Sequence, residues 1–122
     1  MILVDTSVWI DHLRKGDKTL AQLLEQNRVC LHPLVIGELA CGNLSNRKQL
    51  LLLLQNLPAV KEASHKETLF LIESRNLMGK GIGFVDAHLL AASLLNDGVR
   101  FWTRDKRLAQ LAGDLGTALL TH

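Results

Sequence analysis

The first eleven residues constrain the fold of this chain more than any other stretch. Four apolar residues, including the β-branched Ile2 and Val4, run directly into Asp5, and a segment with helical spacing follows. This order predicts a buried strand that ends in a carboxylate, and then a helix that begins near Val8. In open parallel α/β sheets, ligands bind outside the carboxyl ends of the strands, so Asp5 is a candidate site residue. The alternative is that Asp5 merely begins the helix.

The alternation of short apolar runs with helical spacing continues to the end of the chain. Strands are expected at 28–31, 99–103 and 117–121, with a short extended piece at 59–60, and helices at 8–14, 19–26, 34–42, 47–55, 65–77, 84–95 and 106–112. We expect Thr6 or Ser7 to cap the first helix, Ser45 the fourth, and a Ser64–Glu67 capping box the fifth. Strands alternating with helices imply a parallel sheet covered on both faces, with right-handed crossovers.

Size and composition indicate a single domain over residues 1–122. A chain of 122 residues with 48% hydrophobic content can bury a core without staples. Cys30 and Cys41 lack Cys-x-x-Cys spacing, so we interpret them as small buried hydrophobes, and their scarcity fits a reducing cytoplasm. The longest later apolar run, residues 50–54, is too short to span a bilayer. We therefore expect a cytoplasmic protein with no membrane segment.

Three further acids stand at unusual positions. Glu38 lies in a helix that is apolar on nearly every side, Asp86 opens the most apolar helix, and Asp105 follows a strand as Asp5 does. An unpaired buried carboxylate costs several kcal/mol, so such a group is usually protonated, paired or bound to a cation. Each acid also has a structural explanation: an exposed stripe for Glu38, a favourable helix start for Asp86 and an ordinary N-cap for Asp105.

The topology brings these acids toward one place. Asp5 and Asp105 would end two parallel strands at the same edge, and Glu38 and Asp86 can complete a ring if their helices cover that edge. Four oxygen ligands suit Mg²⁺ or Mn²⁺ better than zinc. We assign no ligand role to the histidines, because no pair has helix-face metal spacing: these are His12, His32, His65, His88 and His122.

The net charge fits such a centre. The formal charge is +2, but if the four acids gather, eight acids remain elsewhere against fourteen Lys and Arg, which gives +6 outside the site. An acidic centre within a basic surround is typical of metal-dependent sites that handle a polyanion. A solvated surface with a mild basic excess is the alternative. The loop at 79–83 is glycine-rich but lacks dinucleotide or P-loop spacing, so we expect a mobile rim without a phosphate-cradle role.

Together these residues resemble a known family. The motifs are Val4-Asp5-Thr6-Ser7, Glu38 on an apolar helix, Asp86 opening Asp-Ala-His-Leu-Leu-Ala-Ala, and Thr103-Arg-Asp105. Four acids in this order and spacing are similar to those of PIN domains, specifically the single-domain ribonuclease toxins of the VapBC toxin–antitoxin type. The resemblance covers essentially the whole chain and implies a three-layer α/β/α sandwich with a central parallel sheet.

The resemblance also implies an activity. Asp5, Glu38, Asp86 and Asp105 would hold one or two Mg²⁺ or Mn²⁺ ions that activate water to cleave RNA. Thr6, Ser7 and Thr103 are candidate hydroxyls that orient these carboxylates. Some relatives have a further acid shortly after the position of Asp105, where this chain has Lys106 and Arg107, so a second metal would bind weakly. Candidate phosphate contacts are Lys80, Arg104, Lys106 and Arg107.

Partners and competing interpretations complete the expectations. The family resemblance implies a homodimer and an antitoxin protein that lies near the first and the third or fourth helices. The leucines at 50–54 are too many for one stripe, so part of that face should pack on another element or subunit. A catalytically silent PIN-like binding module stays open. A receiver-type signalling domain is disfavoured, because no second acid lies beside Asp5 and no lysine lies beside the last strand.

Overall fold

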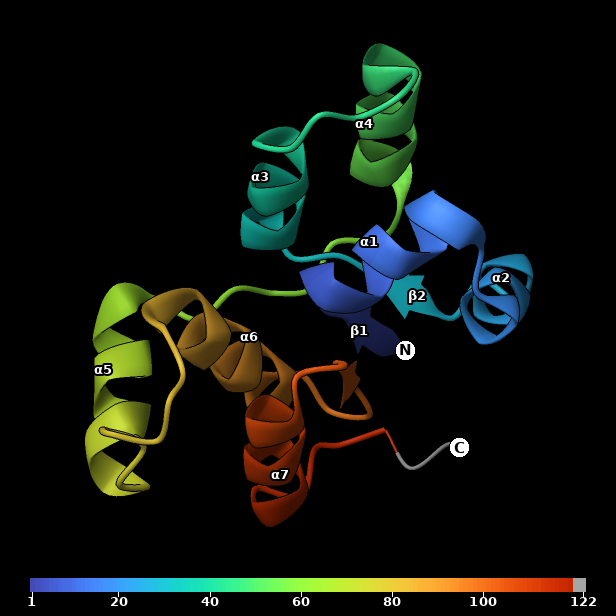
Figure 1. The fold of residues 1–122 in the computed structure, drawn as a ribbon. Helices are drawn as coiled ribbons and strands as arrows, with labels where there is room; N and C mark the ends of the chain where they lie inside the picture. Colours follow the sequence, from blue (N-terminus) through green and yellow to red (C-terminus); the bar gives the residue numbers. More distant parts are fainter. Residues whose placement is uncertain (120–122) are drawn as a thin grey trace.

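A parallel three-stranded sheet forms the centre of the molecule (Figure 1). The structure is a computed structural model and describes residues 1–119. The strands β1 (Ile2–Val4), β2 (Val29–Cys30) and β3 (Arg100–Trp102) lie in the order β2-β1-β3. Leu3 pairs with Cys30 on one side and Phe101 on the other. The predicted parallel sheet is confirmed.

Single bridges extend the sheet at both edges. Leu31 pairs with Ala59, as the expected extended piece requires, and Phe101 pairs with Ala118. The strand expected at 117–121 is therefore represented by one bridge at Ala118, and its last two residues lie outside the described part of the chain.

Seven helices flank the sheet in the described residues. They are α1 (Thr6–Lys15), α2 (Lys18–Glu25), α3 (Pro33–Ala40), α4 (Arg47–Asn56), α5 (His65–Ser74), α6 (Phe84–Leu95) and α7 (Lys106–Asp114). In Figure 1, α3 and α4 lie on one side of the sheet with α1, and α5, α6 and α7 lie on the other. The expected sandwich of helices around a parallel sheet is thus confirmed.

Several local expectations differ from the structure. The first helix begins at Thr6 with Asp5 as its N-cap, so neither Thr6 nor Ser7 is the cap. The fourth helix is preceded by Asn46 in the left-handed region rather than capped by Ser45. The capping box of α5 is present, with Ser64 Oγ accepting from the Glu67 N–H at 3.0 Å. Caps depend on the path by which the chain enters a helix, which local sequence leaves open.

The core surrounds the sheet, and its largest helical contribution comes from α6. All three residues of β1 are buried, and α6 buries seven consecutive residues, from Ala87 to Ser93, against the strands and α5. Cys30 is buried as expected, whereas Cys41 lies past the end of α3 and is exposed, so that expectation is wrong for Cys41. None of the helices in the described chain combines the length and the apolar character needed to cross a membrane.

The leucine-rich helix is only half covered. Leu54 is buried, while Leu52 and Leu53 are 61% and 65% exposed. α4 packs chiefly on α3 at one edge of the molecule, and its outer face, with Leu52 and Leu53, is exposed. Part of the apolar side chains that the sequence places on this helix is therefore exposed on the surface of the protein.

Candidate acidic metal centre

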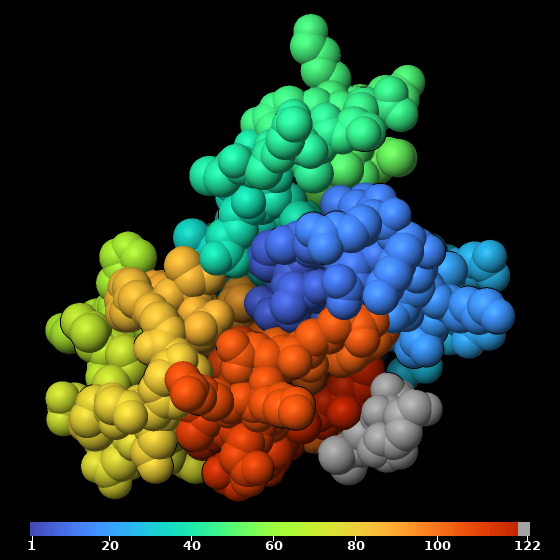
Figure 2. Space-filling view, viewed as in Figure 1, coloured from blue at the N-terminus to red at the C-terminus, as the bar shows by residue number. Residues whose placement is uncertain are grey.

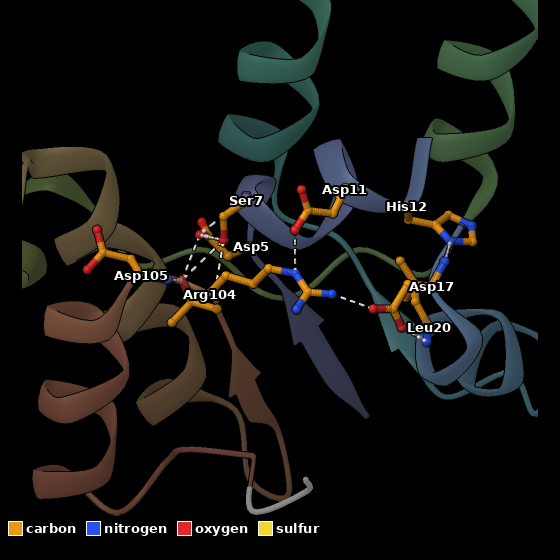
Figure 3. Close-up of polar contacts among 9 residues, drawn as sticks. Asp5, Ser7, Asp11, His12, Asp17, Leu20, Arg104 and Asp105 are labelled. Atoms are coloured by element: carbon orange, nitrogen blue, oxygen red, sulfur yellow. Dashed lines mark hydrogen bonds and ion pairs between the residues drawn. The ribbon is translucent and has the colours of Figure 1, made fainter. Parts of the chain in front are cut away.

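Asp5 stands at the carboxyl end of β1 and is 6% exposed. Its three hydrogen bonds in the described chain all end on Oδ2: from the Thr103 hydroxyl at 2.8 Å, the Ser7 hydroxyl at 2.7 Å and the Ser7 N–H at 3.4 Å. Each hydroxyl in turn accepts a backbone N–H, from Asp105 and Arg104 respectively. Figure 3 shows this corner, in which Oδ2 is fully occupied and Oδ1 is left for another ligand.

The other three acids repeat this arrangement. Thr6 donates its hydroxyl to Glu38 Oε1 at 2.6 Å, and the Gly83 N–H donates to Asp86 Oδ2 at 3.1 Å. Asp105 caps α7 by accepting the Leu108 N–H on Oδ1 at 3.0 Å. Within residues 1–119, each carboxylate therefore has one oxygen held by a donor of the protein and one oxygen without such a donor. Capping and ligand duties are compatible in Asp5, Asp86 and Asp105, because they use different oxygens.

The pKa of Asp86 responds to its burial and to the charges of the other three acids. Burial raises the pKa of the Asp86 carboxyl above its ordinary value of 3.8, the Gly83 N–H opposes this, and the charges of Asp5, Asp105 and Glu38 raise it further. Carboxylates that raise a neighbour's pKa are within electrostatic reach of it. The charges of Asp5, Asp105 and Glu38 therefore reach Asp86, and a metal site shared by the four acids stays a prediction.

Glu38 is exposed, although the apolar sequence of its helix suggests a buried side chain. Its side chain is exposed, so the expected burial is wrong and the exposed stripe is the correct alternative. α3 buries Val35 and Leu39 and turns Glu38 toward Thr6 at the start of α1. An exposed glutamate still attracts a cation when three other carboxylates lie nearby.

The chemistry of these donors fits a divalent cation. Four carboxylates supply only oxygen, and Mg²⁺ and Mn²⁺ prefer oxygen ligands. In the described chain, no three His, Cys, Asp or Glu side chains already stand in the geometry of a finished metal site. Mutual repulsion keeps uncompensated carboxylates apart, and a cation would remove that repulsion. Asp5, Glu38, Asp86 and Asp105 are thus the residues that would hold it.

The four basic residues named from the sequence fall into two groups. Arg104 uses Nε for Asp11 at 2.7 Å and Nη2 for Asp17 (Figure 3). Its guanidinium carbon also lies 5.9 Å from the centroid of the Trp102 ring. Its guanidinium is thus already bound within the protein. The others line a groove of about 350 Å³ beside α7: Lys80, Lys106 and Arg107.

Sequence reasoning missed two structural devices near the centre. Asp11 was given no role, although it holds Arg104 together with the α2 cap Asp17. His88 is buried, and its Nε2 lies 2.7 Å from Nδ1 of His65, which ties α6 to α5. The local sequence carries no signal for either pairing, because the partners are distant in the chain. The Asp17 cap itself is readable from the sequence, since Asp precedes an amphipathic helix.

Comparisons with known proteins agree with this geometry. Residues 2–114 match the profile of a family described as "PIN domain". The chain is 50% identical over 119 residues to Ribonuclease VapC32 of Mycobacterium tuberculosis, from both strain CDC 1551 / Oshkosh and strain ATCC 25618 / H37Rv. Each alignment covers 98% of this chain and 96% of the relative. The similarity therefore spans all four acids and every element of the fold described above.

Proposed function

This chain belongs to the PIN domain family, and on that premise we propose that it is a divalent-metal-dependent endoribonuclease and the toxin of a toxin–antitoxin pair. The observation that carries the proposal is the shared pattern of the acids Asp5, Glu38, Asp86 and Asp105, each with one oxygen held and one free. The relatives named Ribonuclease VapC32, half identical over nearly the full length, support it. The RNA substrate and the unpaired Cys30 and Cys41 fit a cytoplasmic protein.

In the proposed reaction, the carboxylates supply the charge that binds the cation, and the neighbouring hydroxyls hold the carboxylates in position. When bound, Mg²⁺ or Mn²⁺ lowers the pKa of water for attack on a phosphodiester and stabilises the departing oxygen. Ser7 and Thr103 fix the Asp5 carboxylate through Oδ2, which leaves Oδ1 as the oxygen that would bind the cation. Thr6 orients Glu38 in the same way from the neighbouring helix. Such partners hold ligands in place and tune metal affinity.

Metal dependence of RNA cleavage tests the proposal. EDTA should stop cleavage of a mixed RNA panel, and Mg²⁺ or Mn²⁺ should restore it. Zn²⁺ should restore little, because the centre offers no nitrogen or sulfur donor. Full activity in EDTA, or restoration by zinc alone, would contradict the oxygen site. A chain that binds RNA but cuts none under any metal would be a silent binding module instead.

We propose that the antitoxin occupies a groove of about 510 Å³ between α1, α3 and the start of α4. Ile10 and Leu13 contribute exposed apolar side chains there, and Glu38 lines the same groove. An antitoxin segment with apolar anchors and one basic residue would fit the groove and reach the acidic centre. Leu13→Glu should abolish inhibition by the co-encoded protein while cleavage persists, and Leu52→Glu on the outer face of α4 is the matched control. Inhibition that survives Leu13→Glu would exclude this groove.

We propose that the chain dimerises through the outer face of α5 and its neighbours. Phe70 and its neighbour Leu69 are 73% and 55% exposed, and Met78 and Phe84, between α5 and α6 and at the start of α6, are exposed as well. Exposed apolar patches of this kind mark interfaces. In sedimentation experiments, Phe70→Glu should give a monomer, whereas Leu53→Glu on α4 should leave the dimer intact. The opposite result would move the interface to α4.

A further inference from the structure

We propose that the groove between the loop 79–83 and α7, called here the basic groove, carries the RNA strand away from the acidic centre, with Arg107 as its fixed phosphate contact. This inference rests on the proposed function and adds the path of the substrate. The groove has a volume of about 350 Å³ and is lined by Lys80, Lys106, Arg107, Gln110, Leu111 and Asp114. Three of these six residues are cations, which suits a polyanion.

Both walls of the basic groove are joined along the chain to residues of the acidic centre. Lys106 and Arg107 are the first two residues of α7 and follow Asp105 directly. The opposite wall is the loop 79–83, whose last residue, Gly83, donates its N–H to Asp86. Figure 2 shows this loop, in yellow, lying against the orange-red surface of α7. A strand cut at the carboxylates therefore meets the three cations next.

The cations of the groove are free to bind phosphate. Among residues 1–119, ion pairs are formed by Arg104 with Asp11 and Asp17, and by none of Lys80, Lys106 and Arg107. The acid of the groove, Asp114, accepts a hydrogen bond from Gln110 at 3.4 Å and lies at the far end of α7. Arg104 is therefore a structural arginine, and the other three basic residues form the phosphate track.

A contact between the loop and α7 fixes the position of Arg107. Gly81 has a φ of +81°, and a Cβ built on it would lie 2.5 Å from Nη1 and 2.9 Å from Cδ of Arg107. The arginine side chain thus occupies the space that any larger residue at position 81 would need. Gly79 shares the left-handed conformation, at φ +70°, but a Cβ there meets nothing within 4 Å. The sequence predicted this loop as a mobile rim and did not predict that Gly81 packs against Arg107.

Salt-dependent RNA binding tests the assignment of the cations. Binding of a labelled single-stranded RNA is measured with the full chain carrying Asp5→Asn, so that the RNA stays intact, over a series of KCl concentrations. Each lost phosphate contact lowers the slope of log K against log salt by about 0.7 for single strands. Arg107→Gln, Lys106→Gln and Lys80→Gln should each do so. Lys48→Gln on the distant α4 and Arg104→Gln should leave the slope unchanged.

The glycine pair gives a test without any change of charge. Gly81→Ala should weaken RNA binding several-fold, because the new methyl group displaces Arg107, while Gly79→Ala carries the same backbone strain and should bind normally. Equal effects of the two alanines, or an Arg107→Gln slope equal to that of Lys48→Gln, would overturn the groove. A slope lowered by Arg104→Gln would overturn the division between the arginines.

Cleavage by the unmodified chain, measured in parallel, separates this inference from the proposed function. A chain that cleaves RNA while the groove variants bind it normally refutes the groove alone. A chain that shows the expected slopes without cleaving RNA refutes the ribonuclease and keeps the groove. Absence of any RNA binding refutes both.

Discussion

The neighbouring residues Ser7 and Thr6 donate hydrogen bonds to different carboxylates, Asp5 and Glu38, and the environments of these two acids differ. Ser7 serves the strand-end corner, meaning Asp5, Ser7 and Thr103, where the acid is 6% exposed and Oδ2 takes three hydrogen bonds. Thr6 serves the α3 side, meaning Thr6 and Glu38, where the acid is exposed and is held by one hydroxyl. The corner can define where a cation binds, while the α3 side stays accessible to substrate.

The largest expected effect is the loss of cleavage on replacing an acid, and it should be similar for acids on both sides of the centre. Asp5→Asn, Glu38→Gln and Asp86→Asn should each reduce RNA cleavage by more than the roughly 100-fold that loss of an outer partner costs, because each removes charge from the shared cation. Circular dichroism should show an intact fold. Asp105→Asn should be milder, since Asn keeps the cap on α7. Near-normal cleavage by the first three variants at saturating Mg²⁺ would refute the metal site.

The next largest effect is expected from removing the hydroxyls that hold Asp5 and Glu38, and it compares the two sides of the centre directly. Ser7→Ala and Thr103→Val should each weaken the apparent Mg²⁺ affinity by roughly 10- to 100-fold, because Asp5 loses a donor that fixes it. Thr6→Val should weaken the apparent Mg²⁺ affinity by about 10-fold or less, because water can replace the threonine hydroxyl as a donor to the exposed Glu38. Mg²⁺ titrations of cleavage measure both. Equal losses on the two sides would show that the corner has no special role.

A smaller effect concerns the stability of the metal-free chain. Because the pKa of Asp86 is raised, the folded state keeps its proton longer than the unfolded state does. Stability therefore falls as the pH rises from the ordinary value of 3.8 to the raised value, and that loss persists at neutral pH. Asp86→Asn should remove this fall, and Mg²⁺ should stabilise the native chain more than the variant.

Thermal unfolding in EDTA and in Mg²⁺, from acidic to neutral pH, measures this effect. Ser45→Ala, a change in the loop before α4, controls for the mutation itself. A metal-free native chain that matches Asp86→Asn in its pH dependence would show that repulsion within the centre is negligible.

The smallest effect tests the ion pairs behind the corner. Arg104→Gln should lower the free energy of unfolding by about 1 kcal/mol or less, since its partners Asp11 and Asp17 are partly exposed. That corresponds to a fall in Tm of a few degrees, and high salt should reduce the difference. Asp11→Asn should cost less, because Arg104 keeps Asp17. A loss that is unaffected by salt would point to packing on Trp102 instead.

Periodicity explains why most elements were predictable. The apolar residues of β1 and those in the middle of α6, at 87 and 89–92, are buried, and Pro33 begins α3 as expected. The candidate acids were found because each interrupts or ends an apolar element. The exposure of Glu38 was not predictable, since an apolar helix with one covered face has the same sequence pattern as a fully buried helix.

By itself, the sequence determined the order of strands and helices, the four acids and the family, because these follow from local patterns and from motif spacing. Only the tertiary structure decided which hydroxyl serves which acid, that Arg104 is bound by Asp11 and Asp17, and that Gly81 packs on Arg107. These contacts join residues far apart in the chain, and their side-chain directions depend on how the helices pack on the sheet. No local pattern encodes that packing, so the chemistry was readable in advance and its geometry was not.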